Sequence, residues 1–209
     1  MTAGVQLIYL MDPHCGWCFG YSGTIQKIVA HYQDDERLKL SLVTGGLMHP
    51  AIATGPEFGE EKRPIAARVE QIFGVKFADD YFSKVLGSGH LGSLLPCQVI
   101  NAVKTTAPEA VFDFAARLID AAFKESRDIS KLSVCLDVAG EAGFDIEEIR
   151  SLVSSPEVKT MTEDSLYFAK QVGAGFPSLF LRSGDSLTHL GGSELDLKAL
   201  EASVEPRLT

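Results

Sequence analysis

The chain has 209 residues, of which 45% are hydrophobic, and a formal net charge of -9. This length is enough to bury a core without disulfide bonds, either as one domain or as a domain with an insertion. The excess of acidic side chains argues against a nucleic acid or an anionic membrane surface as a partner. No apolar stretch approaches the roughly 18 residues of a membrane-spanning helix, so we expect no membrane partner.

The N-terminal segment lacks the pattern of a secretory leader. No Lys or Arg precedes Lys27, and the apolar run of residues 6–11 leads directly into Cys15. A leader would carry a basic start and a cleavage site. We therefore expect a cytoplasmic protein, and in a reducing cytosol paired cysteines are more often catalytic or metal-binding than structural.

The first 45 residues predict a strand, a helix and a second strand. Residues 6–11 form a short apolar run, residues 15–32 have a helical apolar face, and residues 38–44 alternate with period two until Gly45-Gly46. These patterns are typical of a buried strand, an amphipathic helix and a half-buried strand. Because crossover connections are right-handed, the two strands should be parallel.

Residues 56–154 are predicted to be helical throughout, without a strand. One helix carries its apolar side chains on a single predicted core face: Ile65, Val69, Ile72 and Phe73. Pro108 should open the next helix as its first residue, and Ser130 should cap another. We expect this block to be a helical insertion subdomain.

The remaining chain predicts a helix, two strands and a helix. Ser155-Pro156 opens the first helix, residues 178–182 and 186–190 form a strand pair, and Ser193 should cap the last helix. The combined order is that of an α/β thioredoxin fold with an inserted helical subdomain. The expected thioredoxin-like domain is therefore discontinuous, comprising residues 1–55 and 155–209 around an insertion of residues 56–154.

The most informative motif is Cys15-Gly16-Trp17-Cys18, between the first strand and the first helix. The two-residue gap places the sulfurs one helical turn apart, close enough to bond to each other. With Cys15 at a helix N-terminus, unpaired backbone N–H groups stabilise its thiolate. Thiol–disulfide exchange needs one thiolate to attack and one thiol to resolve. A structural zinc site needs four ligands, and the sequence has no second CxxC and no HxxxH.

Two further cysteines, Cys97 and Cys135, lie far apart in predicted helices. Free cysteines often behave as small buried hydrophobic residues. We expect both to be buried reduced thiols and not a second redox pair.

Four stretches match a known family: residues 12–20, 45–48, 127–130 with 139–145, and 175–180. In them the chain resembles the DsbA-like thiol–disulfide oxidoreductases, and more narrowly their leaderless bacterial branch of protein-disulfide isomerases. The resemblance implies that Cys15 is the nucleophile, Cys18 the resolving thiol and Pro177 a cis proline facing the disulfide. The backbone of Phe176 would then pair with an extended substrate chain.

The same resemblance implies protein or peptide thiols and disulfides as substrates. It implies no cofactor beyond the Cys15–Cys18 pair and no metal, with glutathione as a candidate co-substrate. The oligomeric state stays open, because apolar helix faces can serve a core or an interface.

The sequence departs from many thioredoxin-fold enzymes at one position. These enzymes carry a buried Asp or Glu six residues before the first cysteine, where this chain has Tyr9. Deprotonation of Cys18 therefore needs another base or water, and Asp12 is the nearest candidate in sequence. The Gly16-Trp17 pair between the cysteines is also unusual, so the redox potential cannot be carried over.

Two neighbours of the cysteines are further candidates for substrate binding. Protonated His14 would favour the Cys15 thiolate, but Asp12 opposes that charge, so we favour a solvated loop histidine. Trp17 either packs against its own helix or contacts apolar substrate segments, and both interpretations stay open.

The favoured function is thiol–disulfide oxidoreductase or isomerase activity through Cys15 and Cys18. The first alternative is a non-redox enzyme of the same architecture that binds glutathione, like kappa-class glutathione transferases or hydroxychromene carboxylate isomerases. Those enzymes typically have Ser at the Cys15 position, which argues against them here. The second alternative is a binding module, either a dithiol metal carrier or a chaperone-like surface on the insertion.

Overall fold

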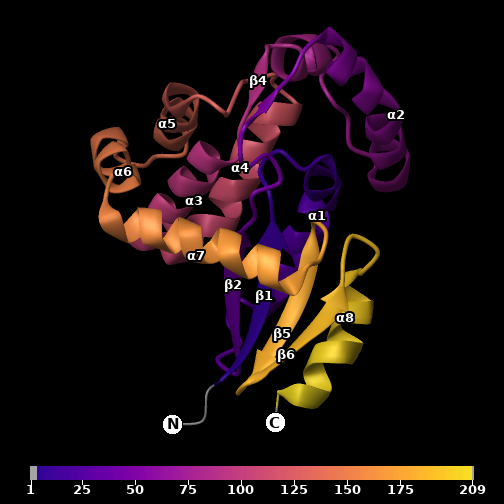
Figure 1. Ribbon diagram of the computed structural model, residues 1–209. Helices are drawn as coiled ribbons and strands as arrows, with labels where there is room; N and C mark the ends of the chain where they lie inside the picture. The colour runs from indigo at the N-terminus through magenta and orange to yellow at the C-terminus, as the bar shows by residue number, and fades with distance from the viewer. Residues whose placement is uncertain (1–3, 209) are drawn as a thin grey trace.

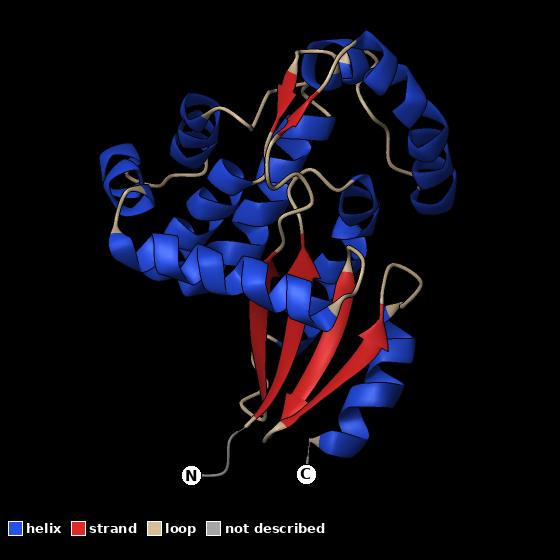
Figure 2. Cartoon of the chain, viewed as in Figure 1, coloured by secondary structure: helices blue, strands red, loops and turns tan. Residues whose placement is uncertain are grey.

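The computed structural model describes residues 4–208 as a four-stranded sheet with helices on both faces and further helices beyond one end (Figures 1 and 2). The strands are β1 (Val5–Met11), β2 (Leu38–Thr44), β5 (Ser178–Ser183) and β6 (Ser186–Gly191), in the order β2-β1-β5-β6. β1 runs parallel to β2 and antiparallel to β5, and β6 is antiparallel to β5. The predicted parallel pair at the start of the chain is confirmed.

Alternate side chains of β1 enter two separate cores. Leu7, Tyr9 and Met11 belong to the larger core, which includes side chains of α1 (Gly16–Tyr32) and α8 (Leu197–Val204). Ile8 and Leu10 face the other way and pack with side chains of α7 (Pro156–Val172). Figure 1 places α7 across one face of the sheet, with α8 beyond the other. A strand buried on both faces reads as an apolar run, and residues 7–11 of β1 form such a run after Gln6.

The chain between β2 and α7 supplies the helices at the C-terminal end of β1. They are α2 (Pro56–Phe73), a π-helix (Phe82–Leu86), α3 (Leu94–Thr106), a 3-10 turn (Pro108–Ala110), α4 (Val111–Phe123), α5 (Leu132–Glu141) and α6 (Ile146–Val153). The expectation of no strand here is wrong in one detail, because β4 (His90–Leu91) pairs with β3 (Ile52–Ala53) in a two-residue antiparallel ribbon. A second 3-10 turn (Glu205–Arg207) follows α8.

Side-chain capping explains four of the eight α-helix starts in residues 4–208, those of α1, α6, α7 and α8. Ser155 Oγ accepts a hydrogen bond from the Val158 N–H, as its Ser-Pro signal predicts, and Asp145 caps α6 in the same way. Two predicted caps are wrong. Asp196, not Ser193, caps α8 by accepting from the Ala199 N–H, and Ser130 makes no cap because its hydroxyl bonds elsewhere.

The apolar face predicted for α2 is only half buried. Val69 is fully buried, whereas Ile65 and Ile72 are 47% and 54% exposed. α2 contacts α1 and the π-helix at one side only, so its remaining apolar side chains face outward. None of the helices in residues 4–208 is long and apolar enough to cross a membrane.

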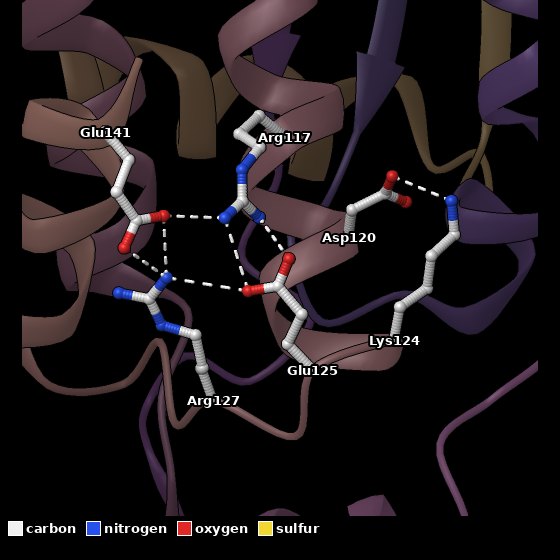
Figure 3. A network of polar contacts seen from close by, with 6 residues as sticks. All are labelled: Arg117, Asp120, Lys124, Glu125, Arg127 and Glu141. Carbon is white, nitrogen blue, oxygen red and sulfur yellow. Dashed lines mark hydrogen bonds and ion pairs between the residues drawn. The ribbon is translucent and has the colours of Figure 1, made fainter. Parts of the chain in front are cut away.

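Four charged side chains tie α4, the following loop and α5 together (Figure 3). Glu141 accepts from Arg117 at 2.6 Å and from Arg127 at 2.8 Å, and Glu125 pairs with both arginines. An exposed single pair contributes little, but a network restrains its segments together. The restrained loop continues directly to Ser130, whose hydroxyl lies 3.2 Å from Nε2 of His14, the residue before Cys15.

Candidate active site

The register of the sheet brings distant parts of the sequence to the cysteine pair. β1 and β5 are antiparallel with Leu10 opposite Ser178, so Pro177 lies beside the C-terminal end of β1. Cys15 follows that end after one turn, in which its N–H donates to the Asp12 carbonyl at 3.0 Å. The Phe176–Pro177 peptide bond is cis, the geometry that the family resemblance implies. Residues 15 and 176 therefore meet although 161 positions separate them.

Cys15 is the N-cap residue of α1, and its sulfur accepts a hydrogen bond from a backbone N–H in the first turn of the helix. The Cys18 N–H donates to Cys15 Sγ at 3.4 Å, and Cys15 Sγ lies 3.4 Å from the Phe176 carbonyl oxygen. A thiolate accepts the N–H at the positive end of the helix dipole, and a thiol donates to the carbonyl. Both forms of Cys15 thus have a partner.

The two sulfurs differ in burial. Cys15 is 5% exposed, Cys18 is fully buried, and both are free thiols. Burial raises the pKa of Cys18 well above its usual value, and a hydrogen bond to Cys15 raises it further. Cys15 is thus the more accessible sulfur and Cys18 the one held protonated behind it.

Asp12 is a buried carboxylate that joins three segments of the site. Its Oδ1 accepts from the His14 N–H at 2.8 Å and from Ser93 Oγ at 3.0 Å, and its Oδ2 accepts from the Leu47 N–H at 2.8 Å. Burial raises the pKa of Asp12 to about 6, against these three bonds, which lower it. Its charge raises the pKa of Cys18. The carboxylate holds the loops after β1 and β2 against the start of α3.

His14 is not the solvated histidine that the sequence suggested. It is 5% exposed, and its Nε2 lies 3.2 Å from both the Gly92 carbonyl oxygen and Ser130 Oγ. A carbonyl oxygen only accepts, so Nε2 carries the proton, and the lone pair of Nδ1 has no hydrogen-bond partner among residues 4–208. Burial lowers the pKa of His14 to about 4, so the ring is neutral at pH 7 and supplies no positive charge to Cys15.

The loop before β5, at Phe176, packs closely against the loop after β2, at Gly45. A Cβ atom on Gly45 would lie 2.0 Å from the Phe176 ring, so only glycine allows this approach. The Gly45 N–H donates to the Met11 carbonyl at 2.6 Å, and its carbonyl accepts from Cys97 Sγ at 3.0 Å. The close contact fixes where the Phe176 carbonyl meets Cys15.

An apolar pocket of about 440 Å³ opens beside Cys15. Its lining is mainly aromatic and aliphatic, and the side chains come from α2 and the following segment through the π-helix: Phe58, Ile65, Ala66, Val69, Phe77, Tyr81, Phe82 and Leu86. The candidate residues Cys15, His14, Trp17 and Phe176 also line it, with Lys62 as a cation. Trp17 is half-buried and packs edge-on against Phe73, with ring centroids 6.3 Å apart. It both packs on α2 and borders the pocket.

Several residues of this site were not found from the sequence. Ser93 and Ser130 bond to Asp12 and His14 from 81 and 116 positions away, and Lys62 and Tyr81 line the pocket. A lone Ser or Tyr in a helical segment carries no local signal of such contacts. The stretch 127–130 was the one hint, since it belongs to the segments that resemble the family.

The other two cysteines are buried free thiols, as predicted. Cys97 and Cys135 are fully buried, and Cys135 Sγ donates to the Ile129 carbonyl at 3.0 Å. Burial raises the pKa of both thiols, that of Cys135 to about 12. Within residues 4–208, no group of three or more His, Cys, Asp or Glu side chains is placed to hold a metal ion.

The fold and the cysteine site together define a class of protein. The chain belongs to the family of DSBA-like thioredoxin domains, whose family model matches residues 6–201. It has the α/β thioredoxin-like fold of DsbA with an inserted helical region, as the sequence predicted.

Individual relatives are similar over almost the whole chain. A Nitrosomonas europaea protein described as a candidate protein disulfide isomerase superposes with a TM-score of 0.86 at 23% identity, covering 98% of both chains. The cytosolic disulfide reductase DsbM from Pseudomonas aeruginosa has a TM-score of 0.78 at 25% identity, covering 98% of this chain and 100% of DsbM. A second structure of DsbM, with GSH, has a TM-score of 0.76 at 26% identity, covering 97% of this chain and 98% of that one.

A more distant curated relative has a different described role. The ClpXP adapter protein SpxH of Halalkalibacterium halodurans is 20% identical over 191 residues, which is 90% of this chain. The match spans 61% of the length of SpxH.

The buried neutral His14 makes folding stability sensitive to acid. An unfolded histidine titrates near pH 6.5, so between about pH 6.5 and 4 the unfolded chain binds a proton that the folded protein excludes. Acidification from pH 7 to 5 should therefore remove roughly 2 kcal/mol of unfolding free energy through this residue. His14→Gln keeps a donor toward Gly92 without the titration, so its urea-measured stability should fall less over this range.

The control is His49→Gln, at an exposed loop position, which should leave the acid sensitivity of the wild type unchanged. An equal loss of stability in His14→Gln and wild type would contradict the assignment of a neutral buried imidazole.

Proposed function

We propose that the protein is a cytosolic thiol–disulfide oxidoreductase that acts through Cys15 and Cys18. One observation carries the proposal: the more accessible sulfur of the pair caps α1 beside the Phe176 carbonyl and the mouth of an apolar pocket. The cytosolic setting rests on similarity to DsbM, which is described as cytosolic.

The proposed reaction proceeds in two exchanges. The Cys15 thiolate attacks one sulfur of a substrate disulfide, forms a mixed disulfide and releases the other substrate sulfur as a thiolate, which takes a proton from water. Cys18 then loses its proton and attacks Cys15 Sγ, which releases the second substrate thiolate and leaves a Cys15–Cys18 disulfide. The substrate gains two electrons and the pair loses two. The same steps in reverse oxidise a substrate dithiol. Isomerisation occurs when a second thiol of the substrate attacks the mixed disulfide, which forms a different substrate disulfide and releases the Cys15 thiolate.

We favour the reducing direction, because no charged imidazole adds to the stabilisation of the reduced pair. DsbA is a strong oxidant because its reduced form is stabilised. Here the start of α1 stabilises the Cys15 thiolate, but the imidazole next to Cys15 is neutral and adds nothing to that stabilisation. The dithiol is thus favoured less than it would be beside an imidazolium, which is the property of a reductant.

The preferred substrates are proposed to be peptide or protein disulfides with apolar side chains near the cysteine. The Phe176 backbone offers hydrogen-bonding groups to an extended substrate chain. The wall of the pocket offers apolar contacts to a side chain near the substrate cysteine. Glutathione is a second candidate, favoured by the structure of DsbM with GSH. A glutathione-binding enzyme without redox turnover remains the alternative that the cysteine variants test.

Cysteine variants test the two roles directly. Cys15→Ser should abolish disulfide exchange because the attacking sulfur is gone, whereas Cys18→Ser should accumulate the mixed disulfide because nothing resolves it. Mass spectrometry of the protein after incubation with a peptide disulfide measures both outcomes. Cys135→Ser is the control, since its hydroxyl can still donate to Ile129 and exchange should be unchanged. Normal turnover by Cys15→Ser would reject the redox function.

The reduction potential tests the direction. Equilibration against dithiothreitol or glutathione mixtures should give one reversible transition closer to about -270 mV, as in thioredoxin, than to about -120 mV, as in DsbA. Trp17 is the single tryptophan and lies between the two cysteines, so its fluorescence reports the transition. A potential near the DsbA value would reverse the proposed direction while keeping the function.

Two exposed isoleucines on α2 form a matched pair for testing substrate preference. Ile65 lines the pocket and Ile72 does not, although both are about half exposed. Ile65→Ser should lower kcat/KM several-fold for a peptide disulfide with a neighbouring Leu or Phe, because about 1 kcal/mol of apolar contact is lost. The same variant should act normally on glutathione disulfide, and Ile72→Ser should act normally on both. Equal behaviour of the two variants on the peptide would remove the pocket from substrate recognition.

A further inference from the structure

A second hollow lies next to the apolar pocket at Cys15, and the two share a wall. It has a volume of about 560 Å³ and is bounded by the C-terminal half of α7, the loop after β2 and the loop before β5. We call it the α7 hollow, and its lining includes Leu166, Tyr167 and Lys170 from α7, with Gly46, His49 and Phe176 from the two loops. Phe176 also lines the pocket at Cys15, so this side chain is common to both spaces.

The two loops form a ridge between the α7 hollow and the pocket. After β2, Gly46 and His49 line the α7 hollow, whereas residues 47–48 line the pocket. Before β5, Ala174 lines the α7 hollow and Gly175 lines the pocket. Because neighbouring residues of the same loops line different cavities, the cavities lie on opposite sides of these loops. A chain that crosses the ridge can therefore reach both.

Exposed apolar side chains gather at these two cavities. In residues 4–208, six large hydrophobic side chains are exposed, and Tyr167 is the most exposed of them at 66%. Three of the six line the cavities, because Tyr167 lines the α7 hollow and Leu47 and Ile65 line the pocket. Single exposed apolar residues are ordinary, but a contiguous apolar surface marks an interaction site. The apolar surface at Cys15 therefore continues across the ridge to α7.

The α7 hollow is a preformed part of the fold. A Cβ atom on Gly46 would lie 2.7 Å from the Leu166 side chain, so the missing side chain at Gly46 lets α7 pack directly on the loop after β2. Ser178 Oγ donates to the Gly175 carbonyl at 2.7 Å and restrains the loop before β5. Phe176 packs against the smaller core of the sheet. The walls of the hollow are therefore in place without a ligand.

We propose that the α7 hollow is a second substrate subsite, which takes an apolar or aromatic side chain from an extended segment of a disulfide-bonded protein or peptide. This inference rests on the proposed function, in which the substrate cysteine reacts at Cys15. An extended chain that pairs with the Phe176 backbone points neighbouring side chains in opposite directions. Side chains that flank the substrate cysteine can then occupy the pocket and the α7 hollow at the same time. Glutathione carries no apolar side chain to place there, so the subsite selects protein segments over glutathione.

The test compares Tyr167→Ser with the wild type on two substrates. One is the disulfide of a peptide that carries Leu and Phe on each side of its cysteine, and the other is glutathione disulfide. Tyr167→Ser should lower kcat/KM for the peptide about threefold to tenfold, because an aromatic contact is lost. The loss should appear in KM, since the contact is made equally before and during the reaction. Turnover of glutathione disulfide should be unchanged.

Two control variants separate this contact from a general effect. Tyr167→Phe keeps the ring and should act like the wild type on both substrates. Leu187→Ser alters another exposed apolar residue, 38% exposed on β6 and outside both linings, and it should also act like the wild type. Equal activity of Tyr167→Ser and wild type on the peptide would overturn the proposal. Equal slowing by Tyr167→Ser and Leu187→Ser, or equal slowing on both substrates, would overturn it as well.

A photocrosslinker tests where the bound segment lies without relying on rates. Benzoylphenylalanine at position 167 of the Cys18→Ser chain should link to the peptide that is held as a mixed disulfide at Cys15. The same probe at position 187 should leave the peptide unlinked, and mass spectrometry distinguishes the two products. Absence of a link from position 167, or equal links from both positions, would contradict the proposal.

Velocity sedimentation tests the other occupant that an apolar hollow can have, a second copy of this chain. In that case Tyr167→Ser would lower the sedimenting mass and leave peptide turnover unchanged, which would overturn the proposal. Failure of the proposed function gives a different result, because the wild type would then exchange neither substrate. Normal exchange by the wild type with no effect of Tyr167→Ser would remove the subsite alone.

Discussion

The buried carboxylate of Asp12 is the interaction on which the geometry of the site depends. It accepts hydrogen bonds from the N–H groups of His14 and Leu47 and from the hydroxyl of Ser93, and these groups belong to three separate segments of the chain. Without it, three donors would lose their partner, and the two buried ones, the His14 N–H and the Ser93 hydroxyl, would each cost about 1–3 kcal/mol. Burial disfavours the charged form of Asp12 and raises its pKa to about 6. The hydrogen bonds to the carboxylate offset part of this desolvation penalty. They also fix the turn that carries Cys15 relative to the loop after β2 and the start of α3.

The sheet supplies the second constraint, which is the meeting of Cys15 with Phe176. β1 is central, and its antiparallel pairing with β5 delivers the loop at Pro177 to the same end of the sheet as the cysteine turn. The absence of a side chain at Gly45 lets the Phe176 ring lie directly on the loop after β2. The insertion completes the site from the other side, because α2 and the π-helix contribute the apolar wall of the pocket. In the proposed function, attack at Cys15 and recognition of an apolar substrate side chain therefore use different parts of the fold.

The protonation of the two cysteines depends on few charged groups nearby. His14 is neutral because burial lowers its pKa to about 4, although its contact with the Gly92 carbonyl favours the charged form. The charge of Asp12 disfavours a thiolate at Cys18, whereas the Asp12 N–H favours it. Cys15 in turn relies on the start of α1. The reactivity of the pair is therefore set by hydrogen-bond donors and a helix end, which act at short range, more than by a neighbouring cation.

The sequence by itself determined the order of the four strands of the main sheet and of the helices around them, but not the β3–β4 ribbon, and it determined the position of the cysteine pair at the start of α1. Hydrophobic periodicity, Gly and Pro signals and the spacing of two cysteines are local properties, so they can be read without knowing what packs where. Only the tertiary structure decided that His14 is buried and neutral, that Ser130 bonds to it instead of capping α5, that Asp196 caps α8, and that Ile65 and Ile72 face outward. These outcomes depend on contacts between residues far apart in the chain, and burial changes both the hydrogen-bond partners and the protonation of a side chain. The sequence located the cysteine pair, and the packing of β5, α2 and α3 around it decided its environment.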